Sequence, residues 1–299
     1  MTPDQTSRVL DMRDAILGEG MTVRRALPHR QQRTVGAWCF MDHAGPVQFD
    51  RGDGMHVGPH PHIGLQTFTW MIEGEVMHRD SLDNEQIIRP GQVNLMTAGR
   101  GIAHTEDSLE DGSRLHAAQL WIALPESRRH GPPAFEHHAV LPQESVDGFT
   151  ATVLIGSALG RTAPTTAHSP LLGMDWVSQG PAQTHMDLRI DFEHAVIPLR
   201  GQVQAGDELL QPGSWLYLPA GQDRLSLQTP DASQFLLLGG TPFEEPLIIW
   251  WNLVARTEDE IRSALDEWES GQFAPVRPGS PAGPLPAPSL QGVRLRARS

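Results

Sequence analysis

The sequence of 299 residues contains no lysine, and all 23 of its basic residues are arginine. This excludes Schiff-base chemistry, a lysine general base and the lysine of a phosphate-binding loop. The sequence has one cysteine, Cys39, so an intrachain disulfide cannot form, which fits a reducing compartment. Neither a nucleophile elbow nor a dinucleotide-binding glycine fingerprint is present.

Long apolar runs and an excess of positive charge are also missing. No apolar stretch approaches the roughly 18 residues of a membrane-spanning helix, and the first residues lack the basic and apolar segments of a secretory signal. The formal net charge is -13, whereas binding to nucleic acids or anionic membranes requires a concentrated basic surface. We therefore expect a soluble cytoplasmic protein with no direct nucleic-acid partner and no membrane partner.

The chain is patterned as a β protein with one helix. Residues 37–125 are short apolar or alternating stretches separated by glycine, proline, aspartate and asparagine, which is typical of an all-β sandwich or barrel. Farther on, Thr257 and Glu260 have the spacing of a capping box before an apolar stripe, which predicts a helix near residues 258–270. Residues 273–299 are rich in proline, glycine and arginine and predict a flexible tail or one lying over the surface.

Two pairs of potential metal ligands share one spacing. His60 and His62 flank a proline, and His104 and Glu106 flank a threonine. Because residues at i and i+2 of a strand point to the same face, each pair can direct both side chains inward. Imidazole nitrogens and a carboxylate oxygen suit a divalent first-row metal such as iron, manganese, nickel, copper or zinc. These four residues are therefore our candidate metal ligands.

The identity of the metal decides what such a site can do. On a six-coordinate metal, four protein ligands leave two positions open for a substrate or dioxygen. Tetrahedral zinc with the same four ligands would be a closed, structural site. Both possibilities stay open on spacing alone. Glycines stand beside both pairs, where the backbone must turn sharply or pass close to a neighbour, at Gly58, Gly64, Gly99 and Gly101.

A weak internal repeat indicates two β domains of one plan, which we place at residues 1–150 and 151–272. The aligned stretches are 89–99 with 211–221 and 73–76 with 200–203. In the same alignment, the four candidate ligands of the first copy fall opposite Asp187, Arg189, Ser226 and Gln228. Since an arginine among the ligands would repel a cation, only the first domain is expected to bind a metal.

Further residues are weaker candidates. His56 could line the mouth of the site, and Thr97 and Arg100 could support it from the turn at Gly99. Four apolar residues could contact a ring-shaped substrate, although core packing is their commoner role: Phe40, Phe68, Trp70 and Met96. The other histidines have no second matching pair and are expected in surface or hydrogen-bonded roles: His29, His43, His78, His116, His130, His137, His138, His168, His185 and His194.

The sequence around both ligand pairs resembles the pirin family. The similar stretches are 59–67 (PHPHIGLQT), 95–106 (LMTAGRGIAHTE) and 119–121 (QLW). The resemblance implies two tandem cupin barrels of the jelly-roll type, with one divalent metal ion, usually iron, in the N-terminal barrel. By the family pattern the ligands are His60, His62, His104 and Glu106, which agrees with the spacing. The expected cofactor is Fe(II), with manganese, nickel, copper or zinc as alternatives.

The resemblance leaves two functions open. Some bacterial pirins resemble quercetin 2,3-dioxygenases, which implies a metal-dependent dioxygenase acting on a flavonol or a related enolic aromatic, with Glu106 as the catalytic proton acceptor. Other members resemble an iron-dependent transcriptional co-regulator or bind metabolic enzymes, which implies a non-catalytic, redox-sensitive module with a protein partner. We favour the dioxygenase. The tail after Phe273 lies outside the shared pattern and carries no inherited role.

Overall fold

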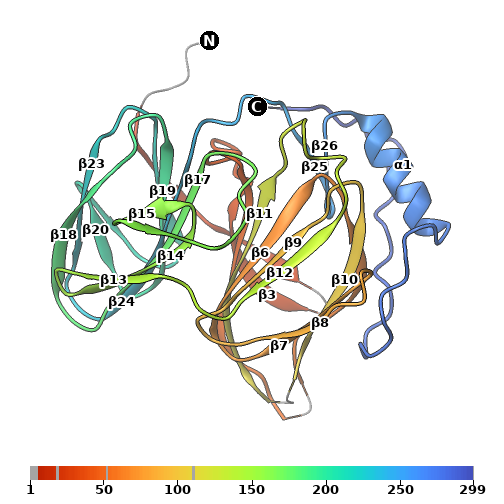
Figure 1. The fold of residues 1–299 in the computed structure, drawn as a ribbon, viewed down its shortest axis with the longest axis horizontal. Coiled ribbons are helices and arrows are strands. Elements are labelled where there is room, and N and C mark those ends of the chain that lie inside the picture. Colours follow the sequence, from red (N-terminus) through yellow and green to blue (C-terminus); the bar gives the residue numbers. More distant parts are fainter. Residues whose placement is uncertain (1–5, 18–19, 52, 110–111, 299) are drawn as a thin grey trace. The chain divides into compact units, whose positions relative to one another are not determined.

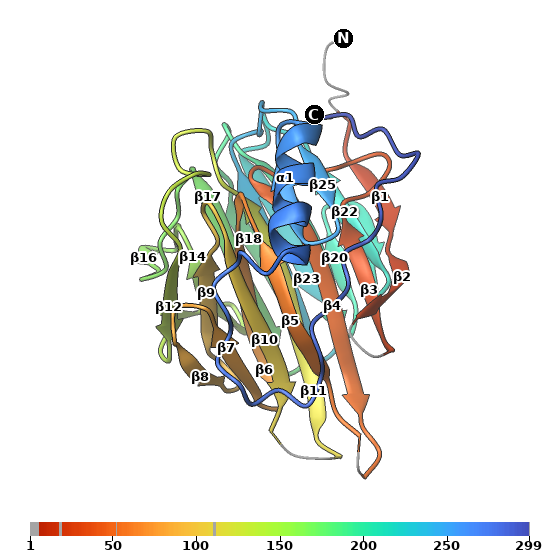
Figure 2. The ribbon, with the colours of Figure 1, turned by 90° about the vertical axis from the view of Figure 1, so that its right-hand side faces the viewer.

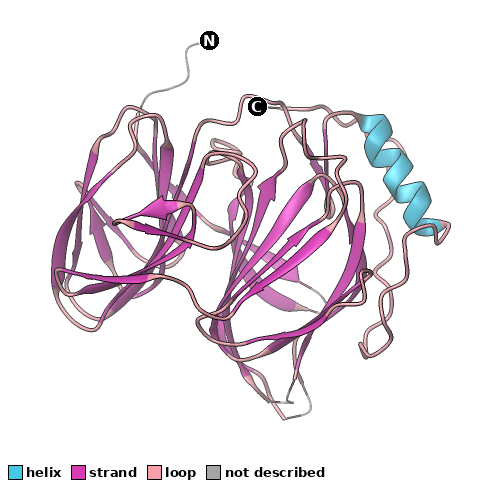
Figure 3. Ribbon diagram, viewed as in Figure 1, coloured by secondary structure: helices cyan, strands magenta, loops and turns pink. Residues whose placement is uncertain are grey.

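The computed structural model of this chain describes residues 6–17, 20–51, 53–109 and 112–298. Nearly all regular structure in these ranges is β-strand, drawn in magenta in Figure 3, and one helix lies near the C-terminus. This confirms the predicted all-β fold with a C-terminal helix. The helix in the described ranges is not long and apolar enough to cross a membrane.

Contacts divide the chain into two units, each built from several segments. Unit 1 comprises Met1–Asp14, Arg24–His43 and Val140–Phe243, and unit 2 comprises Ala15–Val23, Ala44–Ala139 and Glu244–Ser299. Strands β3 (Met21–Leu27) and β4 (Trp38–Gln48) contribute residues to both units, and the helix groups with unit 2. The division into two continuous domains, residues 1–150 and 151–272, stays a prediction.

The two largest sheets in the described residues of unit 2 are antiparallel (Figure 1). The larger has the order β12-β9-β6-β11-β4-β3-β2, with β2 at Arg13–Leu17, β6 at Leu65–Glu73, β9 at Val93–Thr97, β11 at Arg114–Ala123 and β12 at Ala134–His138. The smaller has the order β5-β10-β7-β8, with β5 at His56–His62, β7 at Val76–Asp80, β8 at Glu85–Ile88 and β10 at Ile102–Ser108. Met71 and Leu115 of the larger sheet pack against Val57, Val76 and Ile88 of the smaller one.

Unit 1 repeats this strand order. Its larger sheet is β1-β22-β19-β24-β17-β14-β13, with β1 at Arg8–Asp11, β13 at Gln143–Val146, β14 at Phe149–Ile155, β17 at Leu171–Ser178, β19 at Glu193–Arg200, β22 at Ser214–Leu218 and β24 at Ser233–Gly240. Its smaller sheet is β18-β23-β20-β21, with β18 at Ala182–Asp187, β20 at Val203–Ala205, β21 at Glu208–Leu210 and β23 at Arg224–Thr229. A short hairpin, β15 (Ser157–Ala158) and β16 (Arg161–Thr162), precedes β17. The shared order confirms the two-barrel plan.

Helix α1 (Glu258–Glu269) begins where the sequence predicted. The Thr257 hydroxyl accepts from the Glu260 N–H at 3.3 Å, and the Glu260 carboxylate accepts from the Thr257 N–H at 3.1 Å, so the capping box is complete. Ile261 and Leu265 are buried in an apolar cluster with β25 (Ile248–Trp250) and β26 (Leu253–Ala255). The helix therefore covers this part of unit 2.

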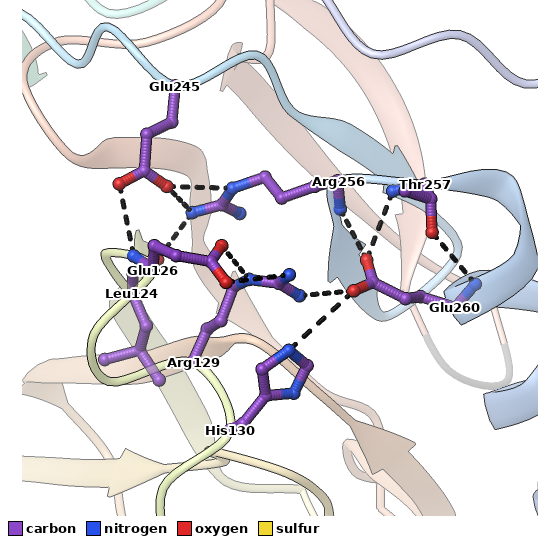
Figure 4. Close-up of polar contacts among 8 residues, drawn as sticks. All are labelled: Leu124, Glu126, Arg129, His130, Glu245, Arg256, Thr257 and Glu260. Carbon is purple, nitrogen blue, oxygen red and sulfur yellow. Dashed lines mark hydrogen bonds and ion pairs between the residues drawn. The ribbon is translucent and has the colours of Figure 1, made fainter.

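Two arginines tie the start of α1 to the loop that follows β11 (Figure 4). Arg129 is nearly buried and donates to the carboxylates of both Glu126 and Glu260. Arg256 donates to Glu245 at 2.9 Å. Burial alone would raise the pKa of Glu260, but hydrogen bonds from the Arg256 N–H and the Arg129 guanidinium outweigh it and lower this pKa to about 2.

The C-terminal tail lies against unit 2 and passes over β5 and β10, as its dark blue trace in Figure 2 shows. The Leu285 N–H donates to the Pro59 carbonyl at 2.9 Å, and the Ser280 hydroxyl donates to Asp107 at 2.9 Å. Leu290 is buried in the same apolar cluster as α1. A cavity of about 610 Å³ lies beside the tail and is lined in part by Trp268.

Candidate metal centre

Strands β5 and β10 bring three of the predicted ligands together. The strands are antiparallel neighbours, with His104 directly opposite His60 and Ile102 opposite His62. Ligand nitrogens of His60, His62 and His104 all lie within 4.8 Å of one another, and the three side chains are buried. The i, i+2 spacing puts the ligands of each strand on one face, and the pairing of the two strands then brings these side chains into a single cluster.

Hydrogen bonds leave the facing nitrogens of this cluster available. His60 Nδ1 donates to the Gly58 carbonyl at 2.8 Å, and His62 Nδ1 donates to the Asn252 carbonyl at 2.8 Å. Because a neutral imidazole carries one N–H, each ring keeps a lone pair on Nε2. His62 Nε2 lies 3.1 Å from His104 Nε2, a separation that is favourable only with a proton or a cation between the nitrogens. The donor set therefore fits a metal ion.

Burial keeps these rings neutral. Desolvation lowers the pKa of His60 to about 4, with the Gly58 hydrogen bond opposing the shift. Desolvation also lowers the pKa values of His62 and His104 well below the usual range, and the neighbouring His60 lowers both further. Since only a neutral imidazole binds a metal, the cluster is in its binding form at pH 7.

Glu106 stands beside the cluster but is not one of the groups within 4.8 Å. It follows a β-bulge in the pairing with β5, so that Val57 rather than Gly58 is its partner. Bulges of this kind re-aim side chains. The pKa of Glu106 is raised to about 7, first by burial and then by the nearby Asp107, while a hydrogen bond with Thr69 opposes both. Its role as a fourth ligand stays a prediction.

Strand pairing identifies the larger sheet's residues that share the cluster's face. The ring of Trp121 lies 5.3 Å from that of His62 in an edge-to-face contact. Thr69 donates to Gln119 at 2.7 Å, and these two residues are cross-strand partners. Met96 is the partner of Thr67 and shares this face. Alternation places Phe68 and Trp70 on the opposite face of β6, so both have the commoner role of core packing. Phe40, also a candidate, belongs to unit 1.

His78 and Asp80 of β7 complete the polar interior. From the sequence, His78 was expected only in a surface or hydrogen-bonded role, and Asp80 was not singled out. Cross-strand pairing puts Asp80 opposite His104 and His78 opposite Glu106. His78 Nδ1 lies 3.3 Å from His104 Nδ1, and its ring stacks on Phe135 at 4.5 Å. A signal was present, because His78-Arg79-Asp80 has the same i, i+2 spacing as the two ligand pairs.

The weaker candidates lie elsewhere. The bulge places His56 opposite Asp107, and its Nδ1 lies 3.1 Å from that carboxylate. Thr97 accepts a hydrogen bond from Gln66 at 3.0 Å, and the side chain of Arg100 is exposed. These residues support strand and turn structure around the site.

Two of the flanking glycines are required by close backbone contacts. A Cβ on Gly58 would lie 1.9 Å from the Gly283 carbonyl oxygen of the tail, and one on Gly64 would lie 2.1 Å from the Val254 oxygen. Gly64 also has a φ of +70°, which side-chain-bearing residues rarely adopt. The two ends of β5 therefore carry glycine for steric reasons.

The equivalent positions in unit 1 carry apolar side chains. Strand β23 pairs with β18 and β20 as β10 pairs with β5 and β7. In this pairing the positions of His60, His62, His104 and Glu106 correspond to Met186, Leu188, Leu225 and Leu227, which are all buried in the unit 1 core. The alignment with Asp187, Arg189, Ser226 and Gln228 is thus wrong by one residue. A one-residue slip moves every side chain to the other face of a strand.

Two tandem barrels with a buried histidine cluster in one of them define a cupin protein with two cupin domains. The pirin family model matches residues 20–122, and the model of the pirin C-terminal cupin domain matches residues 173–274. A Pseudomonas aeruginosa protein, named as a candidate quercetin 2,3-dioxygenase, is 50% identical over 93% of this chain and 89% of its own length. The chain belongs to the pirin family, as the resemblance predicted.

Solved structures agree with this assignment. A crystal structure of quercetin 2,3-dioxygenase from Acinetobacter baumannii matches with a TM-score of 0.95 and 44% identity, covering 99% of both chains. A bacterial pirin of Escherichia coli, solved in complex with nickel(II), has a TM-score of 0.64 and 20% identity over 80% of this chain and all of that one. The second match shows a shared fold.

Proposed function

We propose that this chain is a metal-dependent dioxygenase of the quercetin 2,3-dioxygenase type, acting on a flavonol or a related enolic aromatic. The observation that carries the proposal is the convergence of three neutral, buried imidazoles inside one barrel. The names of the Pseudomonas and Acinetobacter relatives support the activity and a small aromatic substrate.

His60, His62 and His104 would hold one divalent ion, for which Fe(II) is our first choice and manganese, nickel, copper or zinc are alternatives. Glu106, on the same strand as His104, would be the fourth ligand. When bound, the ion supplies Lewis acidity toward the substrate's oxygen atoms and, if redox-active, reactivity toward dioxygen. No other described group of histidine, cysteine or acidic side chains offers a comparable donor set.

The surrounding residues suit an aromatic substrate. Trp121 offers a flat apolar surface beside His62. The carboxylate of Glu106 would accept the proton of the substrate hydroxyl, and its contact with Thr69 would help to orient it. In the overall reaction both atoms of dioxygen enter the opened organic product, and one ring carbon leaves with its own oxygen as carbon monoxide.

Incubation with quercetin in air and under argon tests the proposal. Protein with a measured metal content should consume flavonol and dioxygen in equal amounts in air, release carbon monoxide, and stop when dioxygen is removed. His62→Ala should abolish turnover, whereas His56→Ala, on the other face of the same sheet, should preserve most of it. Turnover that persists without dioxygen excludes the mechanism. An inert, metal-loaded protein would favour the non-catalytic module with a protein partner.

A further inference from the structure

The three clustered histidines differ in what holds their second nitrogen. For His60 and His62 that partner is a backbone carbonyl, at Gly58 and Asn252, which can only accept a hydrogen bond. Each of these rings therefore has a single possible tautomer, with the lone pair on Nε2. Among the described residues no carbonyl accepts from His104, and its Nδ1 instead faces the Nδ1 of another histidine, His78, at 3.3 Å.

Two facing Nδ1 atoms do not by themselves decide which ring carries the proton. If His104 Nδ1 donates, its Nε2 keeps a lone pair toward His60 and His62. If His78 Nδ1 donates, the proton of His104 moves to Nε2, the atom that faces His62 Nε2 at 3.1 Å, and one metal ligand is lost. The ligand set is therefore complete in only one of the two arrangements.

Asp80 resolves this choice. Its Oδ1 accepts from the Leu82 N–H at 2.8 Å, from the Asn84 N–H at 3.2 Å and from the Asn84 side-chain amide at 3.0 Å. Its Oδ2 lies 3.1 Å from His78 Nε2. A carboxylate held by so many donors is an acceptor, so His78 Nε2 carries the proton that points at it. A neutral imidazole carries one N–H, so with that proton on Nε2 the Nδ1 of His78 offers a lone pair to His104.

We propose that His78 and Asp80 are positioning residues that fix the tautomer and orientation of His104 and so complete the metal site. The chain of hydrogen bonds runs from His104 Nδ1–H to His78 Nδ1, and from His78 Nε2–H to Asp80. All three residues are at most 3% exposed, so no solvent competes for these protons. Stacking of His78 on Phe135 at 4.5 Å holds the middle ring in plane.

The unit 1 barrel supports this assignment. By the repeat, the position of His78 corresponds to Ala205, a buried core residue, in the barrel whose equivalent ligand positions are Met186 and Leu225. The acidic position persists as Asp207, which stands in the turn between β20 and β21. The histidine at this position is thus present only in the barrel that has the candidate ligands. The aspartate is present in both barrels.

The matched pair of variants for this proposal is Asp80→Asn and Asp107→Asn. Both replace a buried carboxylate of the β5-β10-β7-β8 sheet, but Asp107 contacts His56 and Ser280 on the outer face. In Asp80→Asn the donors at Oδ1 hold the amide oxygen there, so the amide N–H₂ faces His78 Nε2. Donor and acceptor then exchange in both hydrogen bonds, the one between residue 80 and His78 and the one between His78 and His104. His104 must therefore carry its proton on Nε2.

Two readouts apply, and neither uses turnover. In full-length protein, imidazole ¹⁵N NMR should show a proton on His78 Nε2 in the wild type and in Asp107→Asn, and His104 protonated on Nδ1 once Zn(II) is bound. Metal-free Asp80→Asn should instead carry its protons on His78 Nδ1 and His104 Nε2. Anaerobic titration with Fe(II), and separately with Zn(II), should show about 10- to 100-fold weaker binding for Asp80→Asn, the usual effect of losing an outer partner of a ligand. His78→Gln, whose amide oxygen can accept from His104, should bind more tightly than His78→Phe.

The proposal rests on the proposed function only in assuming a metal at the three histidines. A wild-type spectrum with no proton on His78 Nε2 would overturn it even if no variant folds. Equal affinity losses for Asp80→Asn and Asp107→Asn would also overturn it, because the cause would then be a weakened sheet. If the tautomers and affinities are as expected but the protein does not turn over flavonols, His78 and Asp80 keep their positioning roles. Only the dioxygenase function is then rejected.

Discussion

The two barrels of this chain share a strand order and differ in what fills them. In unit 2 the facing sheets enclose three histidines, a glutamate and a His-Asp pair. In unit 1 the corresponding space holds Met186, Leu188, Leu225 and Leu227 together with the rings of Trp176 and Phe235. The same strand arrangement therefore encloses either a polar site or an apolar core. The residue types at the inward-facing positions of β5 and β10, or of their equivalents, decide which.

The comparison also shows what a polar interior requires beyond its ligands. Each of the three clustered histidines of unit 2 has a hydrogen-bond partner for its second nitrogen, from Gly58, Asn252 or His78. Unit 1 has a buried histidine of its own, His194, and neither of its ring nitrogens has a hydrogen-bond partner among the described residues. Unsatisfied burial of this kind costs stability, so the interior of unit 2 depends on its outer partners as much as on the ligands.

The largest effect should come from giving unit 2 a residue of unit 1. His104→Leu places the side chain of Leu225 at the equivalent ligand position and removes one of three clustered nitrogens. Metal affinity should fall by more than about 100-fold, beyond the usual loss for an outer partner. Competition with a chelator measures this, and His56→Leu is the matched control. Wild-type affinity in His104→Leu would show that the metal binds elsewhere.

The reverse exchange should destabilise unit 1. Leu225→His removes a buried leucine side chain and introduces ring nitrogens into a cluster of apolar side chains. The lost packing and the unpaired polar group together should lower the free energy of unfolding by about 3 kcal/mol or more. Denaturant unfolding gives the number, with Leu209→His at an exposed position as the control. Equal stability of the two variants would mean that this barrel tolerates polar groups as unit 2 does.

The pH dependence of stability should show a further difference between the barrels, caused by His194. Burial lowers the pKa of His194 to about 4 from a usual value near 6.5. Between these values the unfolded chain binds a proton that the folded chain does not, so stability is lost as the pH falls from about 6.5 to 4, by up to about 3 kcal/mol. His194→Leu should remove this part of the pH dependence, whereas His185→Leu, at an exposed site, should leave it. Unfolding free energies measured at pH 7 and 4.5 decide the matter.

Patterns among neighbouring residues of the sequence were sufficient to predict part of this structure. The i, i+2 spacing of His60 with His62, the capping box at Thr257 and the turn-rich strand pattern all depend on neighbours in the sequence, and these predictions agree with the structure. The register of unit 1 against unit 2 was wrong because the turns before β6 and β10 differ in length by one residue from their counterparts. Short alignments of turns do not fix strand register. The bulge that re-aims His56 is a property of the paired strands, which no single segment reveals.

The smallest expected effect concerns α1, which belongs to unit 2 and has no counterpart helix in the described residues of unit 1. Thr257→Ala removes the side chain that accepts from the Glu260 N–H and should cost about 1 kcal/mol of stability. The helix contacts β25 and β26 rather than the histidines, so metal affinity should stay within about twofold of the wild type. Thr257→Ser, which keeps the hydroxyl, should restore most of the stability. If Thr257→Ala instead weakens metal binding as strongly as Asp80→Asn, the helix and the interior of unit 2 form one cooperative element, and the difference between the barrels extends beyond the residues that line them.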